Sequence, residues 1–167
     1  LSKEHKYERA VLGEIWILYP IDEYPDLSYL ETKYDEDAQY IIEAARYTNN
    51  DVKEFGWEKV KEWIDQDHQR LDDYNRGYWW CHGVQAEALV YIPVQTVFTQ
   101  NKTEVHFIRQ HVCTPGLWGV ESDSEDAYKR EVAENELYIL TDMLKTMGIV
   151  GIENLELDWD APFSPWH

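Results

Sequence analysis

Patterns of hydrophobic residues predict β-strands at several places along the chain. These are residues 11–19, 78–94, 104–113 and 153–159, where β-branched, aromatic and leucine residues cluster or alternate with polar ones. Within the longest stretch, small and β-branched residues share one face, and Gln85, Glu87, Leu89 and Tyr91 share the other. Pro93 lies near its end, which predicts an edge strand or the end of a strand.

Other stretches place apolar residues three and four positions apart, the spacing of an amphipathic helix. Residues 36–47 show this spacing until the polar run 48–51 interrupts it, and residues 60–75 and 133–147 show it more clearly. Gly77 and Gly148 follow these last two stretches and are the expected stop signals.

The resulting order, β-α-α-β-β-α-β, predicts an α+β fold. We expect a mainly antiparallel sheet of about four strands packed with two to three helices. A chain of 167 residues is the length of one domain, so residues 1–167 are expected to form a single unit. Residues 1–10 and 160–167 are expected to be irregular tails.

The composition supports a folded core but carries a large excess of acid. Aromatic residues make up 14% of the chain, with eight Trp and twelve Tyr. Against 33 acidic residues stand 15 Lys and Arg, which gives a formal net charge of −18. A field of this sign repels nucleic acid and anionic membranes, so neither is expected as a direct partner. Basic proteins or cations are favoured instead.

The compartment is inferred from three features. No apolar run reaches the length of about 18 residues that a membrane span needs, and the first ten residues do not resemble a signal peptide. Two cysteines, Cys81 and Cys113, do not make a disulfide framework. A cytoplasmic protein is expected, acting in the host cytoplasm if a phage encodes it.

The most acidic stretch, residues 116–131, is a candidate for a calcium-binding loop of EF-hand type. An EF-hand loop needs glycine at its sixth position. Counting from Glu121, the sixth residue is Asp126, so the loop fails. Ser122 followed by Glu125 instead matches a capping box, which predicts that this stretch starts a helix.

A zinc site was weighed for Cys81, His82, His111 and Cys113. Cys81 and His82 are adjacent on an expected strand, so their side chains point to opposite faces and cannot easily share an ion. Buried thiols are favoured, and no metal or cofactor is assigned. The sequence carries no nucleophile, metalloprotease or phosphate-loop motif, and it favours a protein that is not an enzyme.

The acidic residues are spread over the predicted elements rather than gathered in a tail. Carboxylates three or four residues apart on a helix lie about 5–6 Å from one another. A rigid surface of this kind can present a DNA-binding groove with something like the phosphates of its natural ligand. An acidic but otherwise ordinary soluble domain is the alternative explanation of the same composition.

Several blocks of the sequence resemble a set of small acidic proteins encoded by bacteria, plasmids and phages. The blocks are residues 26–30, 67–80, 83–90 and 116–128, and GLWGVESDS in the last is the most specific. The resemblance covers about residues 26–150 and implies an origin in mobile elements. Acidic proteins of mobile elements include DNA-mimicking inhibitors of restriction and CRISPR systems, and the resemblance brings no catalytic residues.

These observations lead to one hypothesis and two alternatives. The hypothesis is a non-enzymatic inhibitor that mimics DNA and blocks the basic, nucleic-acid-binding surface of a host defence nuclease, such as a CRISPR effector or a restriction enzyme. The alternatives are a calcium- or zinc-binding domain or metal-dependent enzyme, and a housekeeping interaction module. Self-association into a homodimer is left open. The expected contact face consists of Glu121, Asp123, Glu125, Asp126, Glu131 and Glu134, with Asp65, Asp72 and Asp73 as a second row and Trp118 or Trp80 as an anchor.

Overall fold

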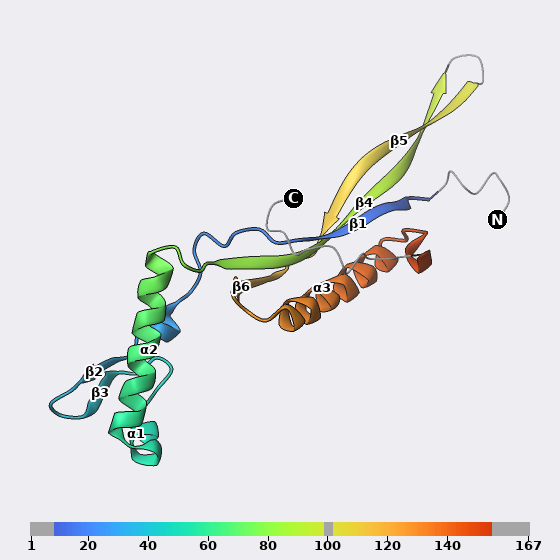
Figure 1. Ribbon diagram of the computed structural model, residues 1–167. Coiled ribbons are helices and arrows are strands. Elements are labelled where there is room, and N and C mark those ends of the chain that lie inside the picture. Colours follow the sequence, from blue (N-terminus) through green and yellow to red (C-terminus); the bar gives the residue numbers. More distant parts are fainter. Residues whose placement is uncertain (1–8, 99–101, 155–167) are drawn as a thin grey trace. The chain divides into compact units, whose positions relative to one another are not determined.

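The computed structural model describes residues 9–98 and 102–154, and it confirms the α+β prediction. The described chain contains three α-helices, a four-stranded antiparallel sheet and a two-stranded sheet (Figure 1). Its residues form two compact units. Unit 1 takes in residues up to 21 together with 82–120 and those from 124 onwards, and unit 2 takes in residues 22–81 and 121–123. The expectation of a single domain stays a prediction.

Unit 1 is built on a sheet whose central strand is β4 (Cys81–Phe98). The antiparallel neighbour on one side is β1 (Val11–Leu18), and on the other is β5 (Lys102–Cys113), which returns from β4 in a hairpin. The shorter β6 (Leu117–Glu121) also pairs with β4. The strands expected over residues 11–19, 78–94 and 104–113 are therefore present, with shifted ends.

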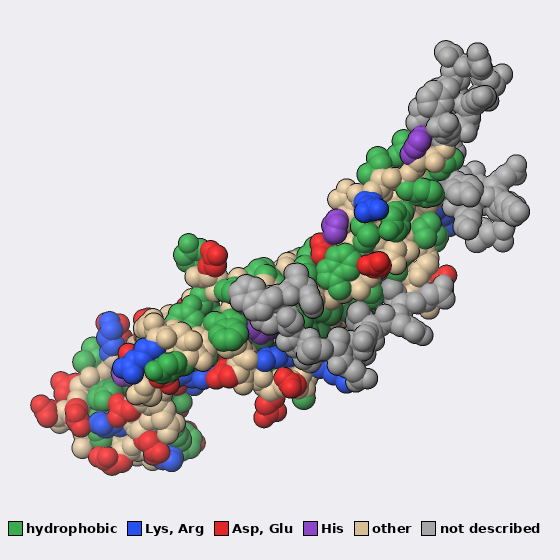
Figure 2. All heavy atoms as spheres, turned by 45° about the horizontal axis from the view of Figure 1, so that its top comes forward, with side chains coloured by type: hydrophobic (Ala, Val, Ile, Leu, Met, Phe, Trp, Pro, Cys, Tyr) green, Lys and Arg blue, Asp and Glu red, His purple; other side chains and the backbone are tan. Residues whose placement is uncertain are grey.

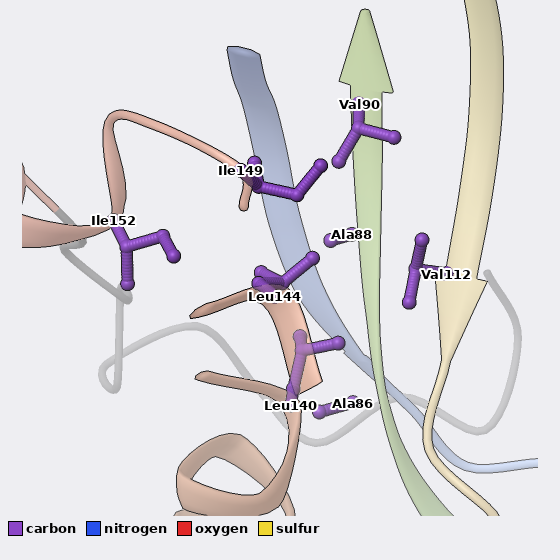
Figure 3. Close-up of a cluster of buried hydrophobic side chains, with 8 residues drawn as sticks. All are labelled: Ala86, Ala88, Val90, Val112, Leu140, Leu144, Ile149 and Ile152. Atoms are coloured by element: carbon purple, nitrogen blue, oxygen red, sulfur yellow. The ribbon is translucent and has the colours of Figure 1, made fainter. Parts of the chain in front are cut away.

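One face of this sheet is covered by α3 (Asp126–Thr146). Leu140 and Leu144 of the helix pack against Ala86, Ala88 and Val90 of β4, and all five side chains are fully buried (Figure 3). These are the residues that the alternation of β4 and the stripe of α3 predict to face inward. Beyond the helix the backbone reverses at a glycine with a φ of 75°, the expected cap Gly148.

The last expected strand, residues 153–159, is wrong for its first two residues. The chain forms the 3-10 helix η3 (Ile152–Asn154), because Ile152 turns inward to join the core beneath α3. Residues 155–159 and the expected tails at 1–8 and 160–167 lie outside the described residues.

The helix expected over residues 36–47 of unit 2 is also wrong. This segment forms a hairpin of β2 (Lys33–Asp35) and β3 (Tyr40–Glu43). The Asp35 carboxylate accepts the Ala38 backbone N–H at 3.0 Å and holds the turn, in which Gln39 has a φ of 54°. Such local side-chain bonds compete with a helix.

The polar run 48–51, expected to interrupt a helix, instead begins α1 (Asn49–Phe55). Thr48 and Asp51 form a capping box, and the Asp51 carboxylate accepts the Thr48 backbone N–H at 2.7 Å. The Asn49 side chain bonds both the backbone N–H and C=O of Ile41, which ties the start of α1 to β3.

The long helix of unit 2 is α2 (Trp57–Asn75), and Gly77, with a φ of 78°, follows its end as expected. Its inner side buries Val60 and Ile64 against Ile41 of β3. Leu30 of the 3-10 helix η2 (Ser28–Leu30) packs with Trp79 and Cys81 in a second cluster. None of the described helices is both long and apolar enough to cross a bilayer.

Candidate functional site

The outer side of α2 carries a stripe of carboxylates. We define the α2 stripe as Glu58, Glu62, Asp65 and Asp72, which follow one another at intervals of four, three and seven residues. With 3.6 residues per turn these positions fall on one side of the helix, over a length of about 21 Å. The helix forms because its apolar residues recur on the opposite side, so burial of that side turns the stripe toward solvent.

Most carboxylates of the α2 stripe have a cation beside them. Lys59 lies 3.3 Å from Glu62, and Arg76 lies 2.8 Å from Asp72. All four of these side chains are more than half exposed. Exposed pairs of this kind contribute about 0–1 kcal/mol each, so an incoming arginine can replace either cation at little cost.

Asp65 is held more firmly than its neighbours. The Tyr34 hydroxyl donates to Asp65 Oδ1 at 2.7 Å, and Lys61 Nζ lies 2.9 Å from Oδ2. Burial alone would raise the pKa of this carboxyl, but the two hydrogen bonds outweigh burial and hold the pKa below its ordinary value. Asp65 is therefore a fixed negative charge, in the middle of a shallow hollow that Glu58, Lys61, Glu62, Gln66 and Gln69 also line.

Two acids of the expected contact face are bound inside unit 2. Arg70 of α2 contacts both Glu121 and Asp123, with 2.8 Å between its Nη2 and Asp123 Oδ1. Glu121 also accepts the Tyr29 hydroxyl at 2.5 Å. The guanidinium lies 4.0 Å from the ring centre of Trp79, and its bonds to these two carboxylates raise the pKa of Arg70. Glu121 and Asp123 thus fasten residues 121–123 to α2.

This arrangement also corrects the capping box expected at Ser122 and Glu125. The Ser122 hydroxyl accepts the backbone N–H of Trp80 at 3.0 Å, and α3 begins only at Asp126. Glu125 occupies the N-cap position and makes no side-chain cap bond. Because Arg70 and Trp80 hold residues 121–123, the helix starts after them.

The remaining acids of the expected contact face belong to unit 1. Glu125, Asp126, Glu131 and Glu134 are all exposed, and only Glu134 has a described ion pair, to Arg130 at 3.3 Å. Asp126 and Glu131 lie about 140° apart around the helix axis, so they do not form one row. The six residues expected as a single face are therefore divided between the two units.

The structure agrees better with the second expected row of acids than with the first. Asp65 and Asp72 belong to the α2 stripe, and Asp73 lies beside it, where its carboxylate accepts a hydrogen bond from Gln69 at 2.9 Å. Sequence reasoning left Glu58 and Glu62 out of the contact residues, although both follow from the helical spacing of this row. The expected anchors Trp118 and Trp80 are 46% and 42% exposed, so each presents an aromatic surface to solvent.

The cysteines and histidines do not converge on a common point. Cys81 is buried beside Leu30 and Trp79 in unit 2, and burial raises the pKa of its thiol to about 11. His82 is buried in unit 1, where burial lowers its pKa and its Nδ1 bonds the Gly83 carbonyl oxygen at 3.0 Å. Within the described ranges, no three His, Cys, Asp or Glu side chains are grouped to hold a metal ion.

Two buried acids of the described chain were not predicted from the sequence, Asp67 of α2 and Glu136 of α3. Asp67 is 5% exposed and pairs with Arg46 at 3.0 Å, while its second oxygen has no described partner. Burial raises the pKa of this carboxyl, against the opposing effect of Arg46. His68, expected on the apolar stripe, is instead exposed and bonds the Thr32 carbonyl oxygen at 2.7 Å. Helical spacing alone does not predict that Asp67 is buried and its neighbour His68 exposed.

The chain matches no protein-family model, and no curated protein or solved structure is significantly similar to it. The resemblance to small acidic proteins of mobile elements therefore stays a hypothesis.

Proposed function

We propose that this chain is a non-enzymatic inhibitor that mimics DNA and occupies the basic, nucleic-acid-binding surface of a host defence nuclease. The observation that carries the proposal is the α2 stripe, with four carboxylates on one side of a helix over about 21 Å. A net charge of −18 directs the whole molecule toward cationic surfaces.

The fixed geometry of the stripe favours mimicry over a loose acidic surface. The inner side of α2 is anchored by Val60 and Ile64, which are fully buried, and Asp65 is held by two hydrogen bonds. Acidic residues spaced by three and four positions on such a helix have their Cβ atoms about 5–6 Å apart. A cationic groove that binds a row of phosphates meets a comparable row of charges here without having to order it.

The cations beside the α2 stripe are placed so that cations of a partner can replace them. Lys59 and Arg76 pair with their carboxylates at exposed positions, where an ion pair contributes little. Arginines of a partner, lined up in a groove and less exposed to water, form stronger charge-assisted bonds than the exposed Lys59 and Arg76 do. Binding then releases the chain's own cations to solvent.

The exposed acids of α3 provide a second charged surface within unit 1. Glu125, Asp126 and Glu131 have no ion pair to any residue of the described part. Because they do not form a row, they are assigned to long-range attraction of the partner rather than to a phosphate-like contact.

The proposal is tested by competition with DNA. The chain is immobilised and exposed to a bacterial lysate, and the captured proteins are challenged with a short DNA duplex at constant ionic strength. Mimicry predicts that the duplex displaces nucleic-acid-binding proteins from the chain, because both occupy the same groove. Captured proteins that stay bound at saturating duplex concentrations would contradict the proposal and favour an ordinary interaction module.

A further inference from the structure

The sheet of unit 1 has a second face, opposite α3. We define the open face as the side of β1, β4 and β5 that carries Trp16, Glu87, Leu89, Tyr91, Arg109 and His111. These positions alternate with the residues that α3 buries, and the described part of the chain places no helix over them (Figure 1). Figure 2 shows hydrophobic side chains along this sheet, whereas acidic side chains gather over unit 2.

A carboxylate in the middle of the open face already has its hydrogen bonds. Glu87 Oε2 accepts the Trp16 indole N–H at 2.7 Å, and Oε1 lies 3.2 Å from His111 Nδ1. The Glu87 side chain is only 18% exposed. A carboxylate on a solvent-exposed sheet surface is hydrogen-bonded by water and needs no donors from the protein. A carboxylate that another surface covers loses that water and needs such donors. This arrangement therefore favours a face that another surface covers.

Two glycines allow aromatic rings to lie flat against the backbone on the open face. A Cβ on Gly13 of β1 would come within 2.4 Å of the Tyr91 ring, and a Cβ on Gly83 of β4 would come within 2.8 Å of the Trp118 ring. Each aromatic ring therefore lies on the backbone of a glycine instead of standing upright. Flat rings suit the close approach of a second sheet, at about 10 Å between backbones.

The charges of the open face are arranged with opposite signs on its two sides. Glu14 on β1 and Arg109 on β5 are both exposed, and Leu89 and Tyr91 of β4 lie between them. A twofold rotation about an axis parallel to β4 keeps the apolar centre on the axis and exchanges the two sides. By the strand register it sets Glu14 of one copy opposite His111 of the other, with Arg109 two residues further along β5, twice over, and it also sets the two Glu87 side chains opposite one another on the axis.

We infer that a second copy of this chain covers the open face, so that two sheets pack face to face around Leu89 and Tyr91. The match between Glu14 and Arg109 is what selects a second copy, since any other occupant would need its own charges in this pattern. The net charge of −18 opposes the association, so the apolar centre and the paired charges set its strength.

Reciprocal charge reversal tests this inference. Sedimentation equilibrium is measured for the wild type, for Glu14→Arg, for Arg109→Glu, for an equimolar mixture of these two variants, and for the double variant. The wild type is expected to dimerise. Each single variant is expected to self-associate at least about tenfold more weakly, because like charges then meet twice. The mixture and the double variant are expected to recover the association within about threefold, since both restore opposite charges.

Two further variants keep the outcome decisive. Glu131→Arg on α3 makes the same change in net charge as Glu14→Arg, away from the open face, and is expected to dimerise as well as or better than the wild type. Leu89→Glu, at the apolar centre, is expected to be monomeric and to keep the far-UV circular dichroism of the wild type. A wild type that is monomeric at every concentration overturns the inference, and so does a mixture that fails to recover. A monomeric wild type that Leu89→Glu destabilises would show that the chain covers this face itself.

Discussion

Arg70 binds Asp123 through two parallel contacts, Nη1 to Oδ2 at 3.0 Å and Nη2 to Oδ1 at 2.8 Å. This bidentate pair joins residues more than fifty positions apart in the sequence and closes over the Trp79 ring. It turns two acids of the most conspicuous acidic stretch into structural ligands of an arginine. Acids of this protein therefore differ in role, since Glu121 and Asp123 are bound internally whereas those of the α2 stripe and the start of α3 are presented to solvent.

Replacing Arg70 is expected to destabilise unit 2. Arg70→Ala removes the bonds to Asp123 and Glu121 and the contact with Trp79, and leaves two carboxylates close together without a cation. We expect a loss of about 2–3 kcal/mol in the free energy of unfolding, measured by urea denaturation. Arg76→Ala is the matched control, because it removes one exposed pair and should cost less than about 1 kcal/mol. Equal effects of the two substitutions would contradict the structural role of Arg70.

A methyl group at Gly83 is expected to displace Trp118. The Cβ of Gly83→Ala would lie 2.8 Å from the indole ring, and Gly83 itself is buried, so the ring has to move. We expect a loss of about 1–3 kcal/mol, with a change in tryptophan fluorescence. The double variant Gly83→Ala with Trp118→Ala removes the collision and should recover part of the loss. A double variant that is no more stable than Gly83→Ala would mean that the ring does not lie on this glycine.

Asp65 and Asp67, two residues apart on α2, are expected to respond to pH with opposite signs. Burial raises the pKa of Asp67 above 3.8 in the folded protein, so its contribution to stability is fully present below pH 3.8 and is lost as the pH rises through the folded pKa. The pKa of Asp65 is lowered in spite of burial, because Tyr34 and Lys61 hydrogen-bond the carboxylate. Its contribution is present above pH 3.8 and is lost as the pH falls through the folded pKa.

The measurement is the free energy of unfolding of Asp65→Asn, Asp67→Asn and the wild type at a series of pH values on both sides of 3.8. The advantage of the wild type over Asp67→Asn should shrink as the pH rises, and its advantage over Asp65→Asn should grow. The two variants control for one another, because each removes one carboxylate from the same helix. Curves that slope in the same direction would show that the two environments are not distinct.

How much of this structure follows from the sequence depends on the range of the interactions. The stripes of α2 and α3 and the alternation of β4 are local periodic signals, and they predicted the elements that build both cores. The spacing of Ile41, Ala44 and Ala45 predicts a helix where the structure has the hairpin of β2 and β3. Bonds from Asp35 and Asn49 to nearby backbone groups decide against it.

The same distinction applies to the candidate site. The acids of the α2 stripe are set by helical spacing, so Asp65 and Asp72 could be chosen in advance. The pairing of Glu121 and Asp123 with Arg70 depends on tertiary contact between segments distant in the sequence, which no periodicity reports. The burial of Asp67 in place of its neighbour His68 likewise depends on the position of Arg46.

The central claim, that the α2 stripe engages a cationic groove, is tested most directly by the salt dependence of binding to a protein that a DNA duplex displaces from this chain. Glu58→Gln with Glu62→Gln and Asp65→Asn removes three of the four charges of the α2 stripe. Glu23→Gln with Asp37→Asn and Glu54→Gln removes the same charge from exposed positions of unit 2 off the stripe. The account predicts that wild-type and control affinities fall steeply, by about tenfold or more, between about 50 and 200 mM salt. It predicts that the stripe variant binds at least about tenfold more weakly at low salt, with a shallower dependence. Equal affinities and equal salt slopes for the stripe variant and its control would contradict it.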